Sequence, residues 1–394
     1  MKNALSKFGQ ILSWIMIVLG LFFGLGVFGE RLWITTQFAT IFYFMVVPFL
    51  IITLLAVLAV HAYLIVKENK KAKTVLIRTC AAGLAFIVLV TEIITFKVVA
   101  HNAGGKYSYF RALTMKDVQM SEPDEKVVYA TKEGQDLSIS VYMPKTNYDS
   151  LRPVYVYMHG GGWCSSDSET NSNIHRQMAD EGYICFSINY RLCTPSSTEN
   201  PTWDKAICDC AEAMNWIKEH AAEYGGNADK ILLCGESAGG NLVLHYAGMT
   251  SEGKLDAPVP SAVFAMYPVV DLQWTADNAH YMTVNTYRGI CEAYIGGDLA
   301  DYPDRVEFVS PLTYMNNNLP PVLIMHGKKD TLVSVEGSRI YKEEADKVGA
   351  DVTVYELPFS NHGTDQQVNR TVLLNWLKGY DGMLPETSRC FDTR

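Results

Sequence analysis

The sequence predicts an α/β fold, a mostly parallel eight-stranded sheet with helices on both faces, preceded by about three transmembrane helices. Two observations predict this fold. The first 100 of the 394 residues contain long uncharged runs, and from about residue 126 short apolar runs alternate with helical stretches. A composition that is 48% hydrophobic and 19% charged also excludes a disordered or fibrous chain.

Charge divides the chain into physically different parts. Of its 33 basic and 42 acidic residues, positions 1–100 hold nine and three, which leaves 24 and 39 for the remainder, a net charge of minus fifteen. We therefore expect a transmembrane anchor over 1–102, a linker over 103–125 and an acidic α/β domain over 126–394. The acidic domain disfavours nucleic acid as a partner, because a phosphate backbone is bound by a basic surface.

Three apolar segments of the anchor are long enough to cross a bilayer. A helix rises about 1.5 Å per residue, so roughly 20 apolar residues span the hydrocarbon core. The expected spans cover residues 8–29, 38–62 and 79–100, and the third is the weakest because Glu92 and Lys97 lie within it. A cleaved signal peptide is the alternative for the first span, although no A-x-A-like cleavage site follows it.

Basic residues predict the orientation of these spans. Five of them crowd the second loop, between residues 67 and 78, so the positive-inside rule makes that loop and the amino terminus cytoplasmic. Three crossings then give a multi-pass protein of the cell membrane with an extracytoplasmic α/β domain. If the third segment does not cross, the domain is cytoplasmic.

The eight strands of the domain are expected from short apolar runs. The first two runs alternate in hydrophobicity, as a half-exposed hairpin does, and most later ones are continuously apolar, as buried parallel strands are. The runs cover 126–131, 137–143, 153–158, 183–189, 231–235, 262–267, 321–326 and 352–356. Helical patterns cover 204–224, 238–249, 335–348 and 364–379, whereas 271–319 fits neither rhythm and is expected to form a cap.

The segment Gly235-Glu236-Ser237-Ala238-Gly239 lies where an apolar strand meets a helical pattern. A serine on a tight strand-to-helix turn needs small neighbours, and the turn presents its hydroxyl at the amino terminus of the helix. A bare G-x-S-x-G match is weak, but this placement strengthens it. Ser237 is therefore the candidate nucleophile.

A second glycine-rich motif, His159-Gly160-Gly161-Gly162-Trp163, directly follows the strand at 153–158. Consecutive glycines let the backbone approach a ligand and point N–H groups at charge that develops on a carbonyl oxygen. A flexible loop and a phosphate cradle are the alternatives. The cradle is disfavoured because no Lys-Ser/Thr pair follows the glycines.

A serine nucleophile needs a base, and the base needs an acid that holds its tautomer. Asp330 follows the strand at 321–326, and His362 lies between the last strand and the last helix, which gives the order serine, acid, histidine. His326, Asp351 and Asp365 are competitors: His326 precedes the acid, Asp351 opens a strand, and Asp365 is expected to cap the final helix.

These residues together resemble the hormone-sensitive-lipase-like branch of the α/β-hydrolases, which includes bacterial acetyl esterases and arylacetamide deacetylase. The resemblance runs from about residue 126 to 380 and rests on HGGGW, NYRL, GESAGGNL, HGKKD and NHG in their usual order. It implies a nucleophilic Ser237, a general base His362 oriented by Asp330, and an oxyanion hole made by the backbone N–H groups of Gly161, Gly162 and Ala238. Where that family has an amino-terminal cap helix, this chain has the apolar anchor, which leaves its lid and its substrate open.

Four further features carry expectations. Arg191 and Asp209 are expected to form an ion pair, and Trp163 to line an acyl pocket or to be a plain core aromatic. Cys164 and Cys193 each follow one of two neighbouring strands and are the only pair that we name as a disulfide candidate. We expect no metal and no cofactor, since the nine histidines are scattered.

The function expected from the sequence is that of a membrane-anchored serine carboxylesterase that hydrolyses short-chain, acetyl-type esters through an acyl-enzyme intermediate. Its partner would be a small-molecule or lipid ester. One alternative is a lipid or prenyl-protein methylesterase acting at the bilayer. Another is a catalytically inactive hydrolase-fold binding module.

Overall fold

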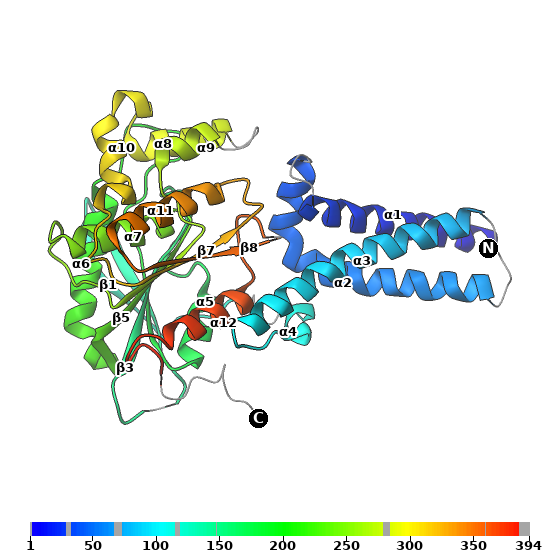
Figure 1. Cartoon of the computed structure of the whole chain (residues 1–394), viewed down its shortest axis with the longest axis horizontal. Helices are drawn as coiled ribbons and strands as arrows, with labels where there is room; N and C mark the ends of the chain where they lie inside the picture. The colour runs from blue at the N-terminus through cyan, green and yellow to red at the C-terminus, as the bar shows by residue number, and fades with distance from the viewer. Residues whose placement is uncertain are drawn as a thin grey trace. The chain divides into compact units, whose positions relative to one another are not determined.

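The computed structural model describes residues 2–28, 33–66, 73–114, 119–146, 148–278, 284–358 and 360–385 (Figure 1). The chain divides into two compact units. The first comprises Met1–Asn102 and Lys106–Asp117, and the second comprises Ala103–Gly105 and Val118–Arg394.

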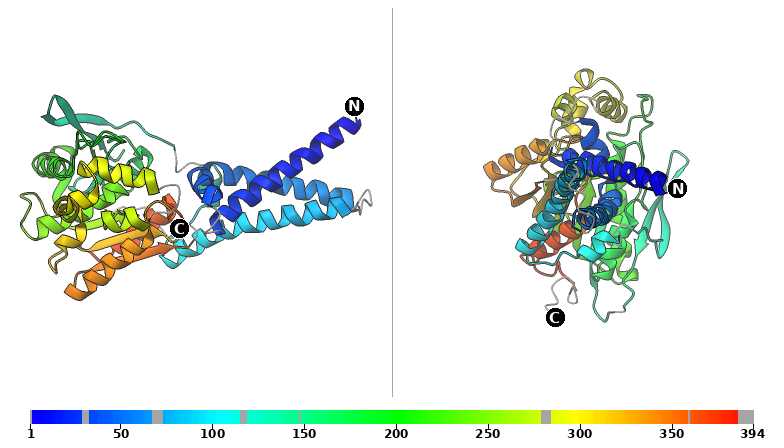
Figure 2. Two further views of the ribbon diagram at one scale, coloured as in Figure 1. Left: turned by 90° about the horizontal axis from the view of Figure 1, so that it is seen from above. Right: turned by 90° about the vertical axis from the view of Figure 1, so that its right-hand side faces the viewer.

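The first unit consists of three long helices and one short one, α1 (Lys2–Phe28), α2 (Trp33–Val66), α3 (Lys73–Asn102) and α4 (Tyr109–Leu113). The long helices pack against one another (Figure 2), and at Gly20 a Cβ atom would lie 3.0 Å from Leu54 and 3.1 Å from Ala85. A small residue at this point lets the three helices approach closely.

Among the residues that the structure describes, two stretches of these helices are long and apolar enough to cross a membrane, Phe49–Val66 and Val75–Asn102, and Phe8–Phe22 is a shorter apolar stretch. The expected second span, 38–62, overlaps the first of these candidates, and the expected third span, 79–100, lies within the second candidate. The shorter stretch lies within the expected first span, 8–29. The side chains of residues 23–48 and of Glu92 lie outside the described residues.

The second unit is built on one eight-stranded sheet with the strand order β1-β2-β4-β3-β5-β6-β7-β8. The pairs β1–β2 and β2–β4 are antiparallel, and the other five neighbouring pairs are parallel. Each expected strand overlaps one of the observed strands: β1 (Glu125–Lys132), β2 (Gln135–Tyr142), β3 (Arg152–Met158), β4 (Ile184–Ile188), β5 (Gly226–Glu236), β6 (Ala262–Met266), β7 (Val322–Gly327) and β8 (Val352–Leu357).

Helices cover both faces of this sheet. Successive side chains of a strand point to opposite faces, and because the central strands are apolar throughout, each face needs a covering layer. The face that carries Val154 and Val156 packs with α6 (Lys205–His220), α7 (Ala238–Ser251) and α11 (Val335–Val348). The face that carries Tyr155 is covered by α5 (Ser172–Asp180) and α12 (Gln366–Leu377), which lie side by side and share the hydrogen bond between Asn173 and Gln366. Helix α5 is not predicted by the sequence analysis.

The segment between β6 and β7, expected as a cap, is helical. It contains α8 (Leu272–Asn278), α9 (Val284–Ile295), η3 (Leu299–Asp301), α10 (Pro303–Val309) and η4 (Pro311–Tyr314). In Figure 1 the helices α8, α9 and α10 gather on one side of the unit. Another 3₁₀-helix, η2 (Ala221–Tyr224), extends α6 and ends the helical pattern expected at 204–224.

Candidate active site

Ser237 occupies the turn between β5 and α7, with φ 53° and ψ −117°. Its N–H donates to the carbonyl of Met266 at 2.9 Å, which continues the pairing of β5 with β6. The turn depends on glycine, because a Cβ at Gly239 would lie 2.0 Å from the Met158 carbonyl oxygen. A larger residue there would push the helix away from the sheet, so the small residues of the motif fix the position of the serine hydroxyl.

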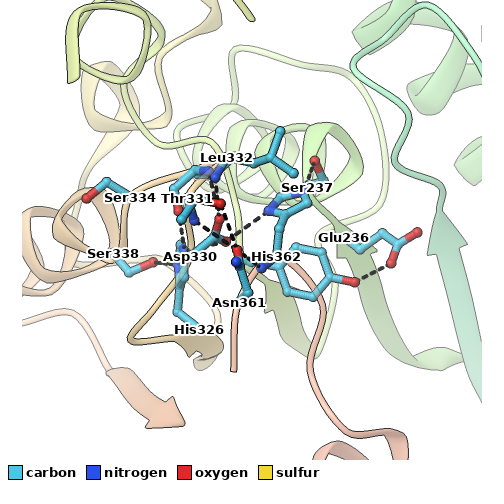
Figure 3. Close-up of polar contacts among 12 residues, drawn as sticks. Glu236, Ser237, His326, Asp330, Thr331, Leu332, Ser334, Ser338, Asn361 and His362 are labelled. Carbon is cyan, nitrogen blue, oxygen red and sulfur yellow. Dashed lines mark hydrogen bonds and ion pairs between the residues drawn. The ribbon is translucent and has the colours of Figure 1, made fainter. Parts of the chain in front are cut away.

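Ser237, His362 and Asp330 are brought together from three different strand ends (Figure 3). The Nε2 atom of His362 lies 2.9 Å from the Ser237 Oγ atom, and its Nδ1 atom lies 2.9 Å from Oδ2 of Asp330. Asp330 follows β7, and His362 lies between β8 and α12. This chain of two hydrogen bonds has the geometry in which a histidine accepts the hydroxyl proton of a serine while a carboxylate holds the tautomer.

Asp330 is held by several donors in addition to His362. Its Oδ1 atom accepts the N–H groups of Leu332 and Val333, both at 2.9 Å, and its Oδ2 atom lies 3.2 Å from Nε2 of His326. Burial alone would raise the pKa of this carboxyl group, but the neighbouring His362 and His326 hold it well below its usual range. Asp330 is therefore ionised and fixed in orientation.

The protonation of His362 depends on two opposing effects. Burial disfavours the charged imidazolium and would lower the pKa of His362. The Asp330 carboxylate, through its charge and its hydrogen bond, and the charge of Glu236 outweigh burial, so the pKa lies above its ordinary value of 6.5. Such a histidine is a stronger base than a free imidazole.

The loop after β3 provides candidate donors for a negatively charged oxygen. Gly161 and Gly162 have φ 101° and 62°, a left-handed backbone, and a Cβ at Gly161 would lie 2.3 Å from the Ser165 carbonyl oxygen. Within the described part of the chain, no backbone carbonyl accepts the N–H groups of Gly161, Gly162 and Ala238. The Ala238 N–H lies at the start of α7, where helical amides have no partner within the helix.

A disulfide fastens this loop to the segment after β4. Cys164 and Cys193, the pair named from the sequence, are joined with Cα atoms 4.6 Å apart. The Cys193 N–H also donates to the Trp163 carbonyl at 2.9 Å. The glycine loop is thus tied to the neighbouring strand connection by one covalent bond and one hydrogen bond.

Trp163 lies in the core of the unit and is fully buried. Its ring stacks on that of Tyr294 from α9, with centroids 4.4 Å apart and planes 7° apart. Trp163 is therefore packed as a core aromatic that joins the glycine loop to the cap helix α9. A role for Trp163 in an acyl pocket stays a prediction.

The ion pair expected between Arg191 and Asp209 is confirmed. Two guanidinium nitrogens of Arg191 donate to the two carboxylate oxygens of Asp209 at 2.8 and 2.7 Å, and Asp209 is buried. The backbone N–H of Arg191 donates to the same carboxylate at 3.0 Å. These bonds connect the loop after β4 to α6, so both side chains have a structural role.

The competing residues lie in other surroundings. Asp365 caps α12 by accepting the N–H of Val368 at 3.0 Å, as expected, and Asp351 accepts the hydroxyl of Tyr380 at 2.9 Å. His326 is fully buried, and its Nδ1 atom pairs with the Ser338 hydroxyl at 2.7 Å. Among the described residues no hydrogen bond joins His326 to Ser237, but His326 contacts the same carboxylate oxygen of Asp330 as His362 does.

The sequence analysis did not single out two residues that lie beside His362. The ring of Tyr267 meets that of His362 edge-on, with centroids 4.7 Å apart, and the Tyr267 hydroxyl donates to Glu236 at 2.5 Å. Glu236 lies inside the serine motif, so its place in the sequence could have drawn attention to it. Tyr267 follows β6, and only the parallel pairing of β5 with β6, in which Glu236 lies opposite Met266, brings it beside Glu236.

Comparison with known proteins matches residues 139–344 to the family model BD-FAE. A probable carboxylic ester hydrolase, LipM, of Mycobacterium tuberculosis is 31% identical over 56% of this chain and 52% of its own length, and carboxylesterase NlhH of the same species is 30% identical over 58% and 71%. The chain thus spans about half the length of the first of these relatives. Esterase 2 of Thermogutta terrifontis, in a structure phosphonylated by sarin, is 24% identical with a TM-score of 0.55, covering 68% of this chain and 98% of that one, and it supports the fold.

Proposed function

The chain belongs to the BD-FAE family, and from that premise we propose that it is a membrane-anchored serine carboxylesterase that hydrolyses short-chain, acetyl-type esters. The observation that carries the proposal is the hydrogen-bonded chain from Ser237 through His362 to Asp330 on a strand-to-helix turn. The relatives named as ester hydrolases add support for the reaction class.

In the proposed reaction the Ser237 hydroxyl oxygen attacks the ester carbonyl carbon while His362 Nε2 accepts the hydroxyl proton. The carbonyl oxygen becomes negatively charged and is held by the backbone N–H groups of Gly161, Gly162 and Ala238, each donor contributing about 10²- to 10³-fold in rate. Collapse of this intermediate expels the alcohol, which takes the proton from His362 and leaves an acyl group on Ser237. Water then repeats the sequence and releases the acid.

A short acyl group is proposed because the cap leaves little room above the glycine loop. A Cβ built at Gly162 would lie 2.9 Å from Ile290 of α9, and Tyr294 of the same helix stacks on Trp163. Helix α9 thus lies directly on the loop that would bind the oxyanion. Displacing these packed side chains to admit a long chain would cost apolar contacts.

Membrane anchorage is proposed from the two apolar candidate spans and the basic second loop. With three crossings the catalytic unit lies outside the cytoplasm, and the disulfide between Cys164 and Cys193 fits an oxidising compartment. The lipid or prenyl methylesterase alternative uses the same machinery, and activity on acetyl against long-chain nitrophenyl esters and prenylcysteine methyl esters separates the two.

The test is the Ser237→Ala variant of the full chain. We expect turnover of p-nitrophenyl acetate to fall by at least about a thousandfold, since the nucleophile is lost, with an unchanged thermal unfolding midpoint. A fluorophosphonate probe should label the wild type and not the variant. Equal turnover in both proteins would refute the assignment of Ser237, and an inactive, unlabelled wild type would favour the catalytically inactive binding module.

A further inference from the structure

Tyr267 is the first residue after β6 and has an unusual backbone. Its φ of 38° lies in the left-handed region, which bulky side chains avoid. The conformation is fixed by its N–H, which donates to the Met325 carbonyl of β7 at 2.7 Å. Strained residues of this kind persist where the surrounding structure determines them, and they gather at functional sites.

The strained backbone directs the Tyr267 side chain at His362. The two rings meet edge-on with centroids 4.7 Å apart, and only 8% of Tyr267 is exposed. Burial raises the pKa of Tyr267 well above its usual range, so its hydroxyl is a neutral donor. That hydroxyl donates to Oε2 of Glu236 at 2.5 Å.

Glu236 is itself fixed on its other oxygen. Its Oε1 atom accepts the side-chain amide of Asn171 at 2.5 Å, and the same amide nitrogen lies 3.1 Å from the Tyr157 hydroxyl. Asn171 precedes α5 in a left-handed conformation with φ 60°, which brings its amide to the end of β5. The Glu236 carboxylate therefore has a donor on each oxygen and little freedom to turn.

We propose that Glu236 and Tyr267 form a second support for His362, in which Glu236 anchors the Tyr267 hydroxyl and the Tyr267 ring holds the plane of the imidazole. The proposal rests on the esterase function proposed above and extends it with two positioning residues. Asp330 fixes the Nδ1 end of His362 through a hydrogen bond, and Tyr267 restricts rotation of the ring by contact. Asn171, directly before α5, supports the arrangement through its bond to Glu236.

Charge gives this support a second effect on the base. The titratable groups that face His362 are Asp330 after β7, Glu236 at the end of β5 and Tyr267 after β6, while His326 acts through Asp330. Glu236 is the second carboxylate of the set. Its negative charge stabilises the imidazolium that forms when His362 takes the serine proton.

The charge effect is tested with Glu236→Gln, which keeps the side-chain shape and removes the charge. The readout is the rate of Ser237 labelling by a fluorophosphonate as a function of pH, which needs neutral His362 and no natural substrate. We expect the midpoint of the rising limb to move down by about half a unit to one unit, because an opposite charge is lost. Glu212→Gln on α6, which loses only a surface ion pair with Lys132, is the matched control and should leave the midpoint in place.

The contact effect is tested with Tyr267→Phe, which keeps the ring and removes its anchor. We expect kcat for p-nitrophenyl acetate to fall about tenfold or more with little change in KM, since a misplaced base affects the transition state. Tyr183→Phe is the matched control, because it also removes a buried tyrosine hydroxyl. The Tyr183 hydroxyl donates to the Met383 carbonyl at 2.7 Å and does not contact the serine. Melting curves show whether Tyr267→Phe folds. If it does not fold, the labelling midpoint of Glu236→Gln alone decides whether the second support exists.

The outcomes separate this proposal from the proposed function. A labelled wild type together with an unlabelled Ser237→Ala variant upholds the nucleophile whatever Glu236→Gln does. An unchanged labelling midpoint in Glu236→Gln, or unchanged kcat in folded Tyr267→Phe, overturns the second support alone. A wild type that neither reacts with the probe nor hydrolyses esters overturns both.

Discussion

The Nδ1 atom of His362 lies 2.9 Å from Oδ2 of Asp330, and this contact links the protonation of the two residues. The buried carboxylate is kept ionised by two histidines, and it in turn raises the pKa of His362 against the effect of burial. Asp330 thus contributes both to the orientation of the proposed base, through the hydrogen bond, and to its strength, through its charge. Its consequence is measurable in the pH dependence of the reaction.

We expect kcat/KM for p-nitrophenyl acetate to rise with pH through a midpoint above 6.5, the ordinary pKa of histidine. The sign follows from the mechanism, because only neutral His362 accepts a proton, and a raised pKa keeps it charged to a higher pH. Initial rates from about pH 5 to 9, corrected for spontaneous hydrolysis, give the profile. A midpoint clearly below that of free imidazole would contradict the proposed influence of Asp330.

Asp330→Asn should lower kcat by about 10⁴-fold, because an amide can donate to Nδ1 and favours the wrong tautomer of His362. Steady-state kinetics of the full chain measure the loss. Asp351→Asn is the matched control, since Asp351 is exposed and accepts the hydroxyl of Tyr380, and no hydrogen bond among the described residues joins it to His362. A loss of less than tenfold in Asp330→Asn would mean that another group orients the histidine.

The strands could be predicted from the sequence because buried parallel strands are continuously apolar. Runs such as 153–158 and 321–326 are continuously apolar, and β3 and β7 lie there. The site was traceable for the same reason, since Ser237, Asp330 and His362 each follow a strand in a recognisable order. Parallel strands bring their carboxyl ends to one edge, so chain order alone suggested that these residues meet.

The elements that the sequence did not predict depend on tertiary contacts. Helix α5 has nine residues and a polar sequence, and its buried face includes Asn173 and His175 beside Met178 and Ala179, so no apolar run marks it. Tyr267 ends an apolar run and looks like any strand residue, yet its left-handed backbone turns the ring to His362. Such a contact depends on register and backbone strain, which a local pattern does not encode.

Loss of the disulfide should destabilise the catalytic unit. Cys164 and Cys193 are separated by 29 residues in sequence. Closing a loop of this size removes unfolded-state entropy worth about 2–4 kcal/mol, so Cys164→Ser together with Cys193→Ser should lower Tm by several degrees. Thermal unfolding of the double variant against Cys208→Ser, which removes an exposed free thiol, provides the comparison. Equal Tm values would show that the bond adds nothing to stability.

The side of the membrane on which the catalytic unit lies can be read from a native residue. Cys208 is a free, exposed thiol on α6. In a background with Cys80→Ser and Cys390→Ser, we expect an impermeant maleimide to label Cys208 on intact cells, because three crossings from a cytoplasmic amino terminus place the unit outside. Cys208→Ser identifies the labelled site, and Lys70→Cys in the second loop should react only after permeabilisation. Protection of Cys208 until the cells are opened would place the unit in the cytoplasm and mean that the apolar segment of α3 does not cross.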